Sequence, residues 1–311
     1  MNANPRPVSI LNQVLGPIMR GPSSSHTAGA YHIASMARGL LGCAPRRAAF
    51  AFDPGGSYGR TYAAQGADRA FAMGLMGKSL TDDSFFTALD DAAASGLAIS
   101  FVIRPLRNPA HPNSMEIALA GEEGTVLQLE AASVGGGEVE ITSLDGWPVR
   151  FDGSAFAVFI EGGIDAADAA AARIREAGYL IDGPDYHVRG DRAAFSATRA
   201  ARLSGQEVEA LCAIPGVINV RQCDPVYFLA NGSTLFSSAE EMVRLAEEKK
   251  SSLGQIALDY ESSLLGLRRE AVVTKILQRY GVMSLSAAQG GSVRSSAKVR
   301  MPRDTSLSSS R

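Results

Sequence analysis

The stretch GPIMRGPSSSHTAGAYHIASMARGLLG, residues 16–42, joins a turn framed by glycine and proline to the beginning of a helix. Its second half repeats apolar residues at spacings of three and four, which predicts one buried helix face, and Gly42 can end that helix. The apolar positions are Ala30, Ile33, Ala34, Ala37, Leu40 and Leu41. The stretch therefore predicts a helix that packs on a core and begins at a strongly polar turn.

Five consecutive side chains at the mouth of this helix carry a hydroxyl or an imidazole: Ser23, Ser24, Ser25, His26 and Thr27. One Ser or Thr is enough to cap a helix, so capping alone does not account for the group, which predicts a substrate-contacting or interdomain role. Hydroxyl and backbone amide donors at a helix N-terminus suit a carboxylate, and an imidazole titrates near neutral pH. We interpret the four hydroxyl residues as substrate-binding candidates and His26 as the catalytic candidate.

The composition of the 311 residues, 46% hydrophobic and 20% charged, predicts a globular protein of about two domains. Thirty basic and 32 acidic residues nearly cancel, which gives no electrostatic reason to expect a nucleic acid or an anionic membrane as partner. A small neutral or zwitterionic ligand fits better. No apolar run approaches the roughly eighteen residues of a membrane helix, so we expect a cytoplasmic protein.

The three cysteines, Cys43, Cys212 and Cys223, are too few and too scattered for a disulfide framework. None belongs to a Cys-x-x-Cys pair that could start a zinc or iron–sulfur site. We therefore expect each of them to be a small buried residue and expect no metal ligand in this chain.

The pattern of elements predicts the α+β class and begins with a mixed part over residues 1–152. Here short strands are expected at 48–53, 98–103, 115–119, 125–130 and 138–143, with a helix over about 66–77. Three glycines at 135–137 indicate a break or bulge, or a place where the backbone approaches a ligand.

Three further parts follow. Residues 153–230 have the order βαββαβ, which is ferredoxin-like by topology. Residues 231–284 are helical and too thin to stand alone, so we expect them to dock on the preceding parts or on another chain. The Ser-rich and basic residues 285–311 are expected to be disordered.

Several motifs resemble those of one enzyme family. GPSSSHTAG at 21–29 is followed by GGSYGRTY at 55–62, AFAMGLMG at 70–77, HPNSMEIAL at 111–119 and SVGGGEVEITSLDG at 133–146. Together they resemble the β chain, or β domain, of the iron–sulfur-dependent L-serine dehydratases (L-serine ammonia-lyases). The 153–230 part is similar to the ACT domain that ends the β subunit of the two-chain type, and 237–284 resembles the opening helices of the catalytic α chain.

The resemblance implies a lyase that removes water from L-serine to give pyruvate and ammonia without pyridoxal phosphate. In that family a 4Fe–4S cluster with one iron free of cysteine acts as Lewis acid on the substrate hydroxyl, while a base takes the α proton. The cluster cysteines belong to the α part, and the likeness of this chain to the α part stops before any of them. The resemblance thus implies a separate α chain, a homodimer, or both.

The resemblance adds site candidates and one departure. Ser57, Asp68 and Asn113 join the substrate-binding candidates because they fall in the matching loops. The family loop reads Thr-Tyr-Lys-Gly-His-Gly-Thr-Asp, whereas here Gln65 stands where the histidine is, and an amide cannot shuttle a proton near neutral pH. The resemblance therefore implies that the substrate-binding residues are kept, whereas one imidazole among the catalytic residues is replaced by Gln65.

The remaining histidines have competing interpretations. His111 can approach the same site or stabilise its own turn, His32 is a residue of the helix face, and His187 is expected on a strand of the 153–230 part.

Three interpretations of function stay open at this point. The first is a serine dehydratase component, or a diverged relative acting on another small hydroxy- or thiol-amino acid. The second is a non-catalytic amino-acid-binding or regulatory protein, which the loss of the loop histidine favours. The third is a truncated gene product whose frame was lost after about residue 284. Sequence does not separate serine, threonine and cysteine, since they differ by one group.

Overall fold

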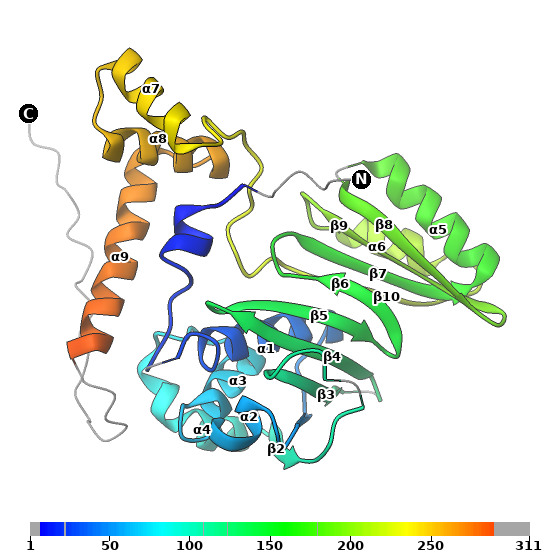
Figure 1. Ribbon diagram of the computed structural model, residues 1–311. Helices are drawn as coiled ribbons and strands as arrows, with labels where there is room; N and C mark the ends of the chain where they lie inside the picture. The colour runs from blue at the N-terminus through cyan, green and yellow to red at the C-terminus, as the bar shows by residue number, and fades with distance from the viewer. Residues whose placement is uncertain (1–6, 22, 108, 123, 179, 289–311) are drawn as a thin grey trace, which may run out of the picture.

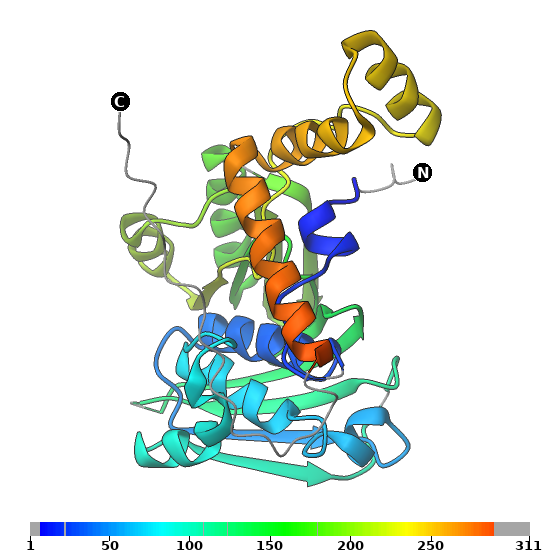
Figure 2. The ribbon, with the colours of Figure 1, turned by 90° about the vertical axis from the view of Figure 1, so that its left-hand side faces the viewer.

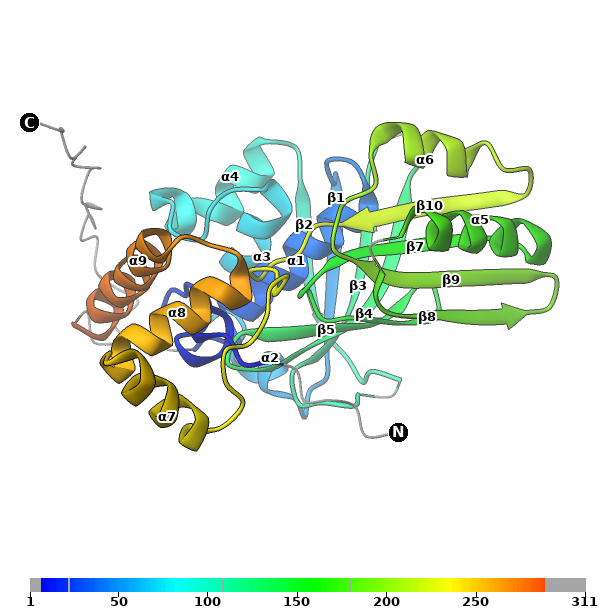
Figure 3. The same cartoon turned by 90° about the horizontal axis from the view of Figure 1, so that it is seen from above.

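The structure is a computed structural model that describes residues 7–21, 23–107, 109–122, 124–178 and 180–288. Two β-sheets lie beside each other, and a helical arm extends away from both (Figure 1). Seen from above, the smaller sheet and the arm lie at opposite sides of the molecule (Figure 3). The mixture of helices and sheets confirms the α+β expectation, and no described helix is long and apolar enough to cross a membrane.

The larger sheet has six strands, and only its first pair is parallel. Short strands with alternating burial produce one covered and one open face. The order across the sheet is β2 (Ala98–Ile103), β1 (Arg47–Phe52), β3 (Ser114–Ala120), β4 (Val126–Gly135), β5 (Glu138–Leu144) and β6 (Trp147–Phe151). The five expected strands are confirmed, and β6 was missed.

The covered face carries α1 (Ala28–Leu41), which crosses β3, β4 and β5 and packs on α3 (Ala67–Met76). All six apolar residues expected on the buried face of α1 are in fact buried, and Gly42 ends the helix in the left-handed conformation (φ 79°). The absence of a side chain at Gly74 lets the two helices cross closely, since a Cβ at this position would lie 2.6 Å from the carbonyl oxygen of Tyr31. Shorter helices complete the layer: α2 (Ser57–Thr61), η2 (Asp83–Thr87) and α4 (Ala88–Ala94).

The smaller sheet is antiparallel, with strand order β10-β7-β9-β8. Its elements confirm the expected βαββαβ order: β7 (Phe156–Gly163), α5 (Ile164–Ala177), β8 (Leu180–Arg189), β9 (Arg192–Arg199), α6 (Gly205–Cys212) and β10 (Val217–Cys223). Apolar residues of α5 and α6 pack on one face, while β10 contacts α1. His187 lies on β8, as expected.

A buried carboxylate joins the two sheets. Glu161 of β7 is 3% exposed and accepts hydrogen bonds from the indole of Trp147 at 2.6 Å and from the amide of Asn219 at 3.1 Å. It also pairs with the Arg192 guanidinium. Because Trp147 belongs to β6 and the other partners to the smaller sheet, this network fixes one sheet against the other.

The helical arm consists of α7 (Ala239–Lys249), α8 (Leu253–Leu265) and α9 (Arg269–Ala288). It docks on the preceding chain, as expected, through a small apolar cluster that includes Leu11 and Tyr260. The π-helix η1 (Ile10–Val14), which sequence reasoning missed, packs beside α8, and α9 runs down toward α1 (Figure 2).

The expected disorder from residue 285 is wrong for 285–288, which continue α9. No glycine or proline follows Gly281 until Gly290, so nothing in the local sequence stops the helix earlier. The rest of the expected tail, 289–311, lies outside the described residues.

Candidate functional site

The polar turn before α1 wraps around the His26 side chain. The Ser23 hydroxyl lies 3.0 Å from Nδ1 of His26 and accepts a hydrogen bond from the His26 backbone amide at 3.3 Å. The Thr27 hydroxyl donates to the Ser23 carbonyl at 2.9 Å. These local bonds explain the crowding of hydroxyl residues, since Ser and Thr stabilise turns by bonding to backbone a few residues away.

The other ring nitrogen faces α2. Nε2 of His26 lies 3.2 Å from the Ser57 hydroxyl and 3.1 Å from that of Thr61. Ser57 and Thr61 are four residues apart and therefore share one helix face. Thr61 was missed by sequence reasoning, although its spacing from Ser57 in a short helix was a usable signal.

A single tautomer of His26 satisfies this network. The Thr61 hydroxyl donates to the Ser57 carbonyl at 2.9 Å, and a hydroxyl has only one proton, so its oxygen accepts from Nε2–H. Nδ1 then accepts from the Ser23 hydroxyl. This assignment follows from the hydrogen-bond pattern, since hydrogens are inferred from their partners.

His26 is buried and electrically neutral. It is 4% exposed, and its ring lies 4.6 Å from that of Tyr58, which is itself buried. Desolvation lowers the pKa of His26 below its ordinary 6.5, although the Ser57 backbone partly opposes this. No described residue gives the imidazole a carboxylate partner, so the arrangement is not a Ser-His-Asp triad.

The 111–114 turn adds a polar group next to α2. The Ser57 amide donates to the Pro112 carbonyl at 2.9 Å, and the Asn113 side-chain amide donates to the Ser133 carbonyl at 3.2 Å. The side-chain oxygen of Asn113 is buried and has no hydrogen-bond partner in the part of the chain that the structure describes. Nδ1 of His111 accepts from the Asn113 amide at 3.1 Å, which is the turn-stabilising role. A buried acceptor left free is costly, so it is a natural contact for a ligand donor.

The remaining candidates fall into two groups. Ser24 and Ser25 are half-buried, and their hydroxyls bond to no described residue, while the Ser25 carbonyl accepts from the Tyr58 hydroxyl at 2.6 Å. Asp68 instead lies on α3, where it accepts from the Arg69 amide at 2.8 Å and makes no hydrogen bond to the His26 group among described residues. Burial raises the pKa of Asp68. The structure thus brings the hydroxyls of Ser23, Ser57 and Thr61 to the ring of His26. Thr27 is bonded to Ser23, Asn113 belongs to the turn that contacts Ser57, and Asp68 makes no described bond to this group.

The described residues do not fit an iron–sulfur cluster. The cysteines lie on separate elements, and no described group of three or more His, Cys, Asp or Glu side chains could hold a metal. Burial raises the pKa of Cys223 to about 12, whereas a cluster ligand must be a thiolate. The expectation that all three cysteines are buried is wrong for Cys212, which is exposed at the end of α6, and Cys43 is half-buried.

Comparison with known proteins finds two similar β chains. The chain is 40% identical over 147 residues to the probable L-serine dehydratase, beta chain, of Bacillus subtilis (strain 168), covering 47% of this chain and 65% of the relative. It is 34% identical over 149 residues to the L-serine dehydratase, beta chain, of Peptoniphilus asaccharolyticus, covering 48% of this chain and 66% of the relative. The matches thus span just under two thirds of the relatives' lengths. No family model matches the chain.

Proposed function

We propose that this chain, about half of which belongs to the L-serine dehydratase β-chain family, binds L-serine or a similar small amino acid at the mouth of α1. The observation that carries the proposal is the buried, neutral His26 held by hydroxyls of the turn and of α2. The same turn carries the hydroxyls of Ser24 and Ser25, which bond to no described residue, and the neighbouring 111–114 turn carries the Asn113 side-chain oxygen, which has no partner among the described residues. These groups have the donors and the acceptor that a zwitterion needs.

Each group has a proposed part in binding. The Ser24 and Ser25 hydroxyls and the backbone at the helix mouth donate to the substrate carboxylate. The oxygen of Asn113 accepts from the substrate ammonium, which removes the cost of leaving that oxygen unpaired. His26, unprotonated at neutral pH, can take a proton at Nδ1 once the Ser23 hydroxyl turns away.

The reaction class we propose is dehydration and deamination of a β-hydroxy amino acid, a lyase activity. Because the described residues do not fit a 4Fe–4S cluster, we assign the cluster to a separate α chain and derive no step through it. Gln65 has no proton to exchange near neutral pH, so His26 is the proton-transfer candidate of this chain. The partner arrangement follows from the β-chain name of the relatives.

We keep the division into 1–152, 153–230 and 231–284 as part of this proposal. The 153–230 part is proposed to be ACT-like, which is supported by its βαββαβ order and its strand order β10-β7-β9-β8. Residues 231–284 are proposed to be the beginning of an α-type part.

Calorimetry with L-serine tests the binding proposal. We expect the full chain to bind L-serine and expect His26→Gln and Asn113→Leu each to weaken binding at least tenfold. The matched control His187→Gln removes an imidazole from β8 and should leave binding unchanged. Absence of heat with the wild-type chain, or equal binding by all variants, would refute the assignment.

Turnover separates catalysis from binding alone. The chain is mixed anaerobically with a reconstituted cluster-bearing α chain, and pyruvate is measured after L-serine is added. We expect pyruvate in the mixture and none with either chain alone. Serine binding without pyruvate would support the second candidate, a non-catalytic amino-acid-binding or regulatory protein, which Gln65 and the poor fit of the cysteines favour.

A further inference from the structure

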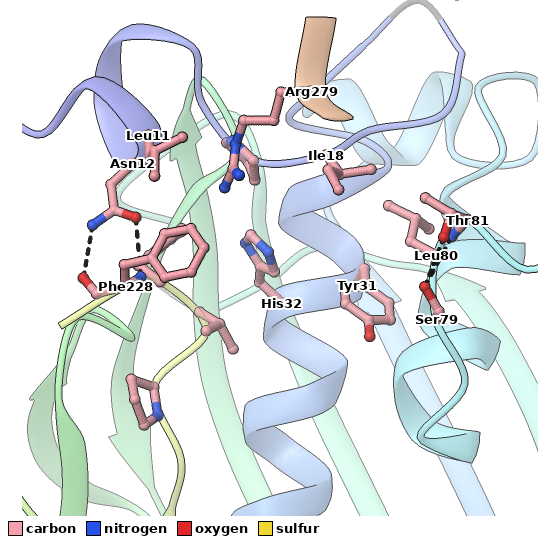
Figure 4. A pocket seen from close by; sticks show the side chains of 14 residues that line it. Leu11, Asn12, Ile18, Tyr31, His32, Ser79, Leu80, Thr81, Phe228 and Arg279 are labelled. Carbon is pink, nitrogen blue, oxygen red and sulfur yellow. Dashed lines mark hydrogen bonds between the residues drawn. The ribbon is translucent and has the colours of Figure 1, made fainter. Parts of the chain in front are cut away.

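A cavity of about 270 Å³ lies between α1, α9 and the segment 225–228. Its walls are mainly apolar and include Leu11, Ile18, Leu80 and Phe228 (Figure 4). Arg279 is its charged group, and His32 lines it together with Tyr31 and Tyr227. In Figure 4 the Arg279 side chain descends from α9 toward the His32 ring. Pockets for drug-sized ligands start near roughly 300 Å³, so this one suits a small molecule.

Arg279 is held in place by a backbone carbonyl and an aromatic ring. Its Nε donates to the Gly16 carbonyl at 2.8 Å, and its guanidinium lies 5.2 Å from the centre of the Phe228 ring. No described carboxylate lies within ion-pair distance of it. Burial lowers the pKa of Arg279, but an arginine stays charged at neutral pH.

The carboxylate of Glu261 acts on Arg279 through its charge but is hydrogen-bonded to other groups. Glu261 raises the pKa of Arg279 through its charge, yet its carboxylate accepts from the Ser9 hydroxyl at 2.5 Å and from the amides of Ile10 and Leu11 at 2.7 and 2.9 Å. A second cation, Lys275, lies 4.7 Å from the centre of the same Phe228 ring. The outer nitrogens of Arg279 bond to no described residue and can therefore donate to an anion.

His32 offers a hydrogen-bond acceptor beside this cation. Its Nδ1 lies 3.2 Å from the Gly137 carbonyl, which can only accept, so the proton is on Nδ1 and Nε2 carries a lone pair. Burial lowers the pKa of His32 to about 4, with Arg279 adding to the effect, so the ring is neutral at pH 7. The cavity thus contains a cation that can donate hydrogen bonds to an anion, Arg279, and an acceptor that can bond to a donor, Nε2 of His32.

We propose that this cavity binds a small α-amino acid with an apolar side chain. Arg279 binds the carboxylate, Nε2 of His32 accepts from the ammonium, and the side chain lies against Leu11, Ile18 and Leu80. The site shares no residue with the His26 group, which is bonded to α2, and it lies between α9 and α1.

Calorimetry with L-valine and its two fragments tests each contact. 3-Methylbutanoate keeps the carboxylate and lacks the ammonium, whereas 2-methylpropylamine keeps the ammonium and lacks the carboxylate. We expect L-valine to bind and each fragment to bind at least tenfold more weakly. No binding of L-valine up to about 10 mM, ten times a dissociation constant of about 1 mM, would overturn the proposal.

Variants assign the contacts to residues. Arg279→Met should weaken L-valine at least tenfold, and Arg279→Lys, which keeps the charge and guards against a folding defect, should weaken it less. His32→Phe should remove the advantage of L-valine over 3-methylbutanoate. The control Arg269→Met removes an arginine of the same helix that pairs with Asp259 and should bind L-valine normally. Equal binding by Arg279→Met and Arg269→Met refutes this site, while serine binding at His26 is measured independently.

Discussion

Replacing His32 by Phe should remove a defined part of the pH dependence of folding. In the folded chain burial lowers the pKa of His32 from its ordinary 6.5 to about 4, so the unfolded chain takes up the proton first as the pH falls. The contribution of neutral His32 to the free energy of unfolding is therefore fully present above about pH 6.5, and it is lost progressively as the pH falls to about 4. With about 1.4 kcal/mol per pH unit, the loss is about 2 kcal/mol at pH 5 and about 3 kcal/mol in full.

The measurement is urea unfolding of wild type and His32→Phe at about pH 7.5, 6 and 5. The informative quantity is the difference in unfolding free energy between the two proteins, because other titrating groups cancel in it. We expect the wild type to lose about 2 kcal/mol more unfolding free energy than His32→Phe when the pH falls from about 7.5 to 5. The control Tyr227→Phe removes a hydroxyl that donates to the same Gly137 carbonyl at 2.9 Å and should keep the wild-type pH dependence. A difference that does not vary with pH contradicts the buried, neutral state of His32.

Two further predictions concern stability. Gly74→Ala should destabilise the fold by about 1–3 kcal/mol, because the new methyl group would meet the Tyr31 carbonyl oxygen at 2.6 Å. The control Gly281→Ala on α9 places its methyl group in open space and should stabilise the fold by about 0.5–1 kcal/mol. Thermal unfolding with both variants equally destabilised would disprove the close crossing of α1 and α3. Glu161→Ala should cost about 2–4 kcal/mol, since it leaves buried donors unpaired at about 1–3 kcal/mol each, while the exposed Glu209→Ala should stay within about 0.5 kcal/mol. Equal urea midpoints for these two variants would argue against a structural role for the buried carboxylate.

Local periodicity predicted most elements because each is specified within a few residues. The apolar spacing of α1 and its final Gly42 are local signals, and so is the Ser238 hydroxyl that caps α7 by accepting from the Glu241 amide. The missed π-helix η1 depends on a distant residue, because Glu261 of α8 accepts from its first amides. No pattern within residues 10–14 carries that information.

The candidate site was predictable in composition but only partly in geometry. The turn sequence identified His26 and its neighbouring serines, and the structure adds Thr61, which reaches Nε2 from another element. Asp68 follows the same loop in sequence, yet on α3 its carboxylate accepts from the neighbouring Arg69 amide and makes no described bond to this group. Spacing along the chain does not determine such orientations, because they depend on how α2 and α3 pack on β1.

The surroundings of His26 restrict what its imidazole can do. In a triad a carboxylate stabilises the imidazolium, whereas here the partners at both ring nitrogens are neutral hydroxyls, and burial lowers the pKa. Protonation of His26 is therefore unfavourable until a negative charge arrives nearby. In the proposed complex a substrate carboxylate at the helix mouth would supply such a charge, since an opposite charge within about 4–6 Å raises the pKa of a histidine. We thus expect the His26 pKa, followed by NMR of the ring protons, to rise when L-serine binds and to stay unchanged with ethanolamine, which lacks the carboxylate. Under the proposed function His26 would become a stronger base only when the substrate is bound, which agrees with its hydroxyl partners and with the absence of a bonded carboxylate among the described residues.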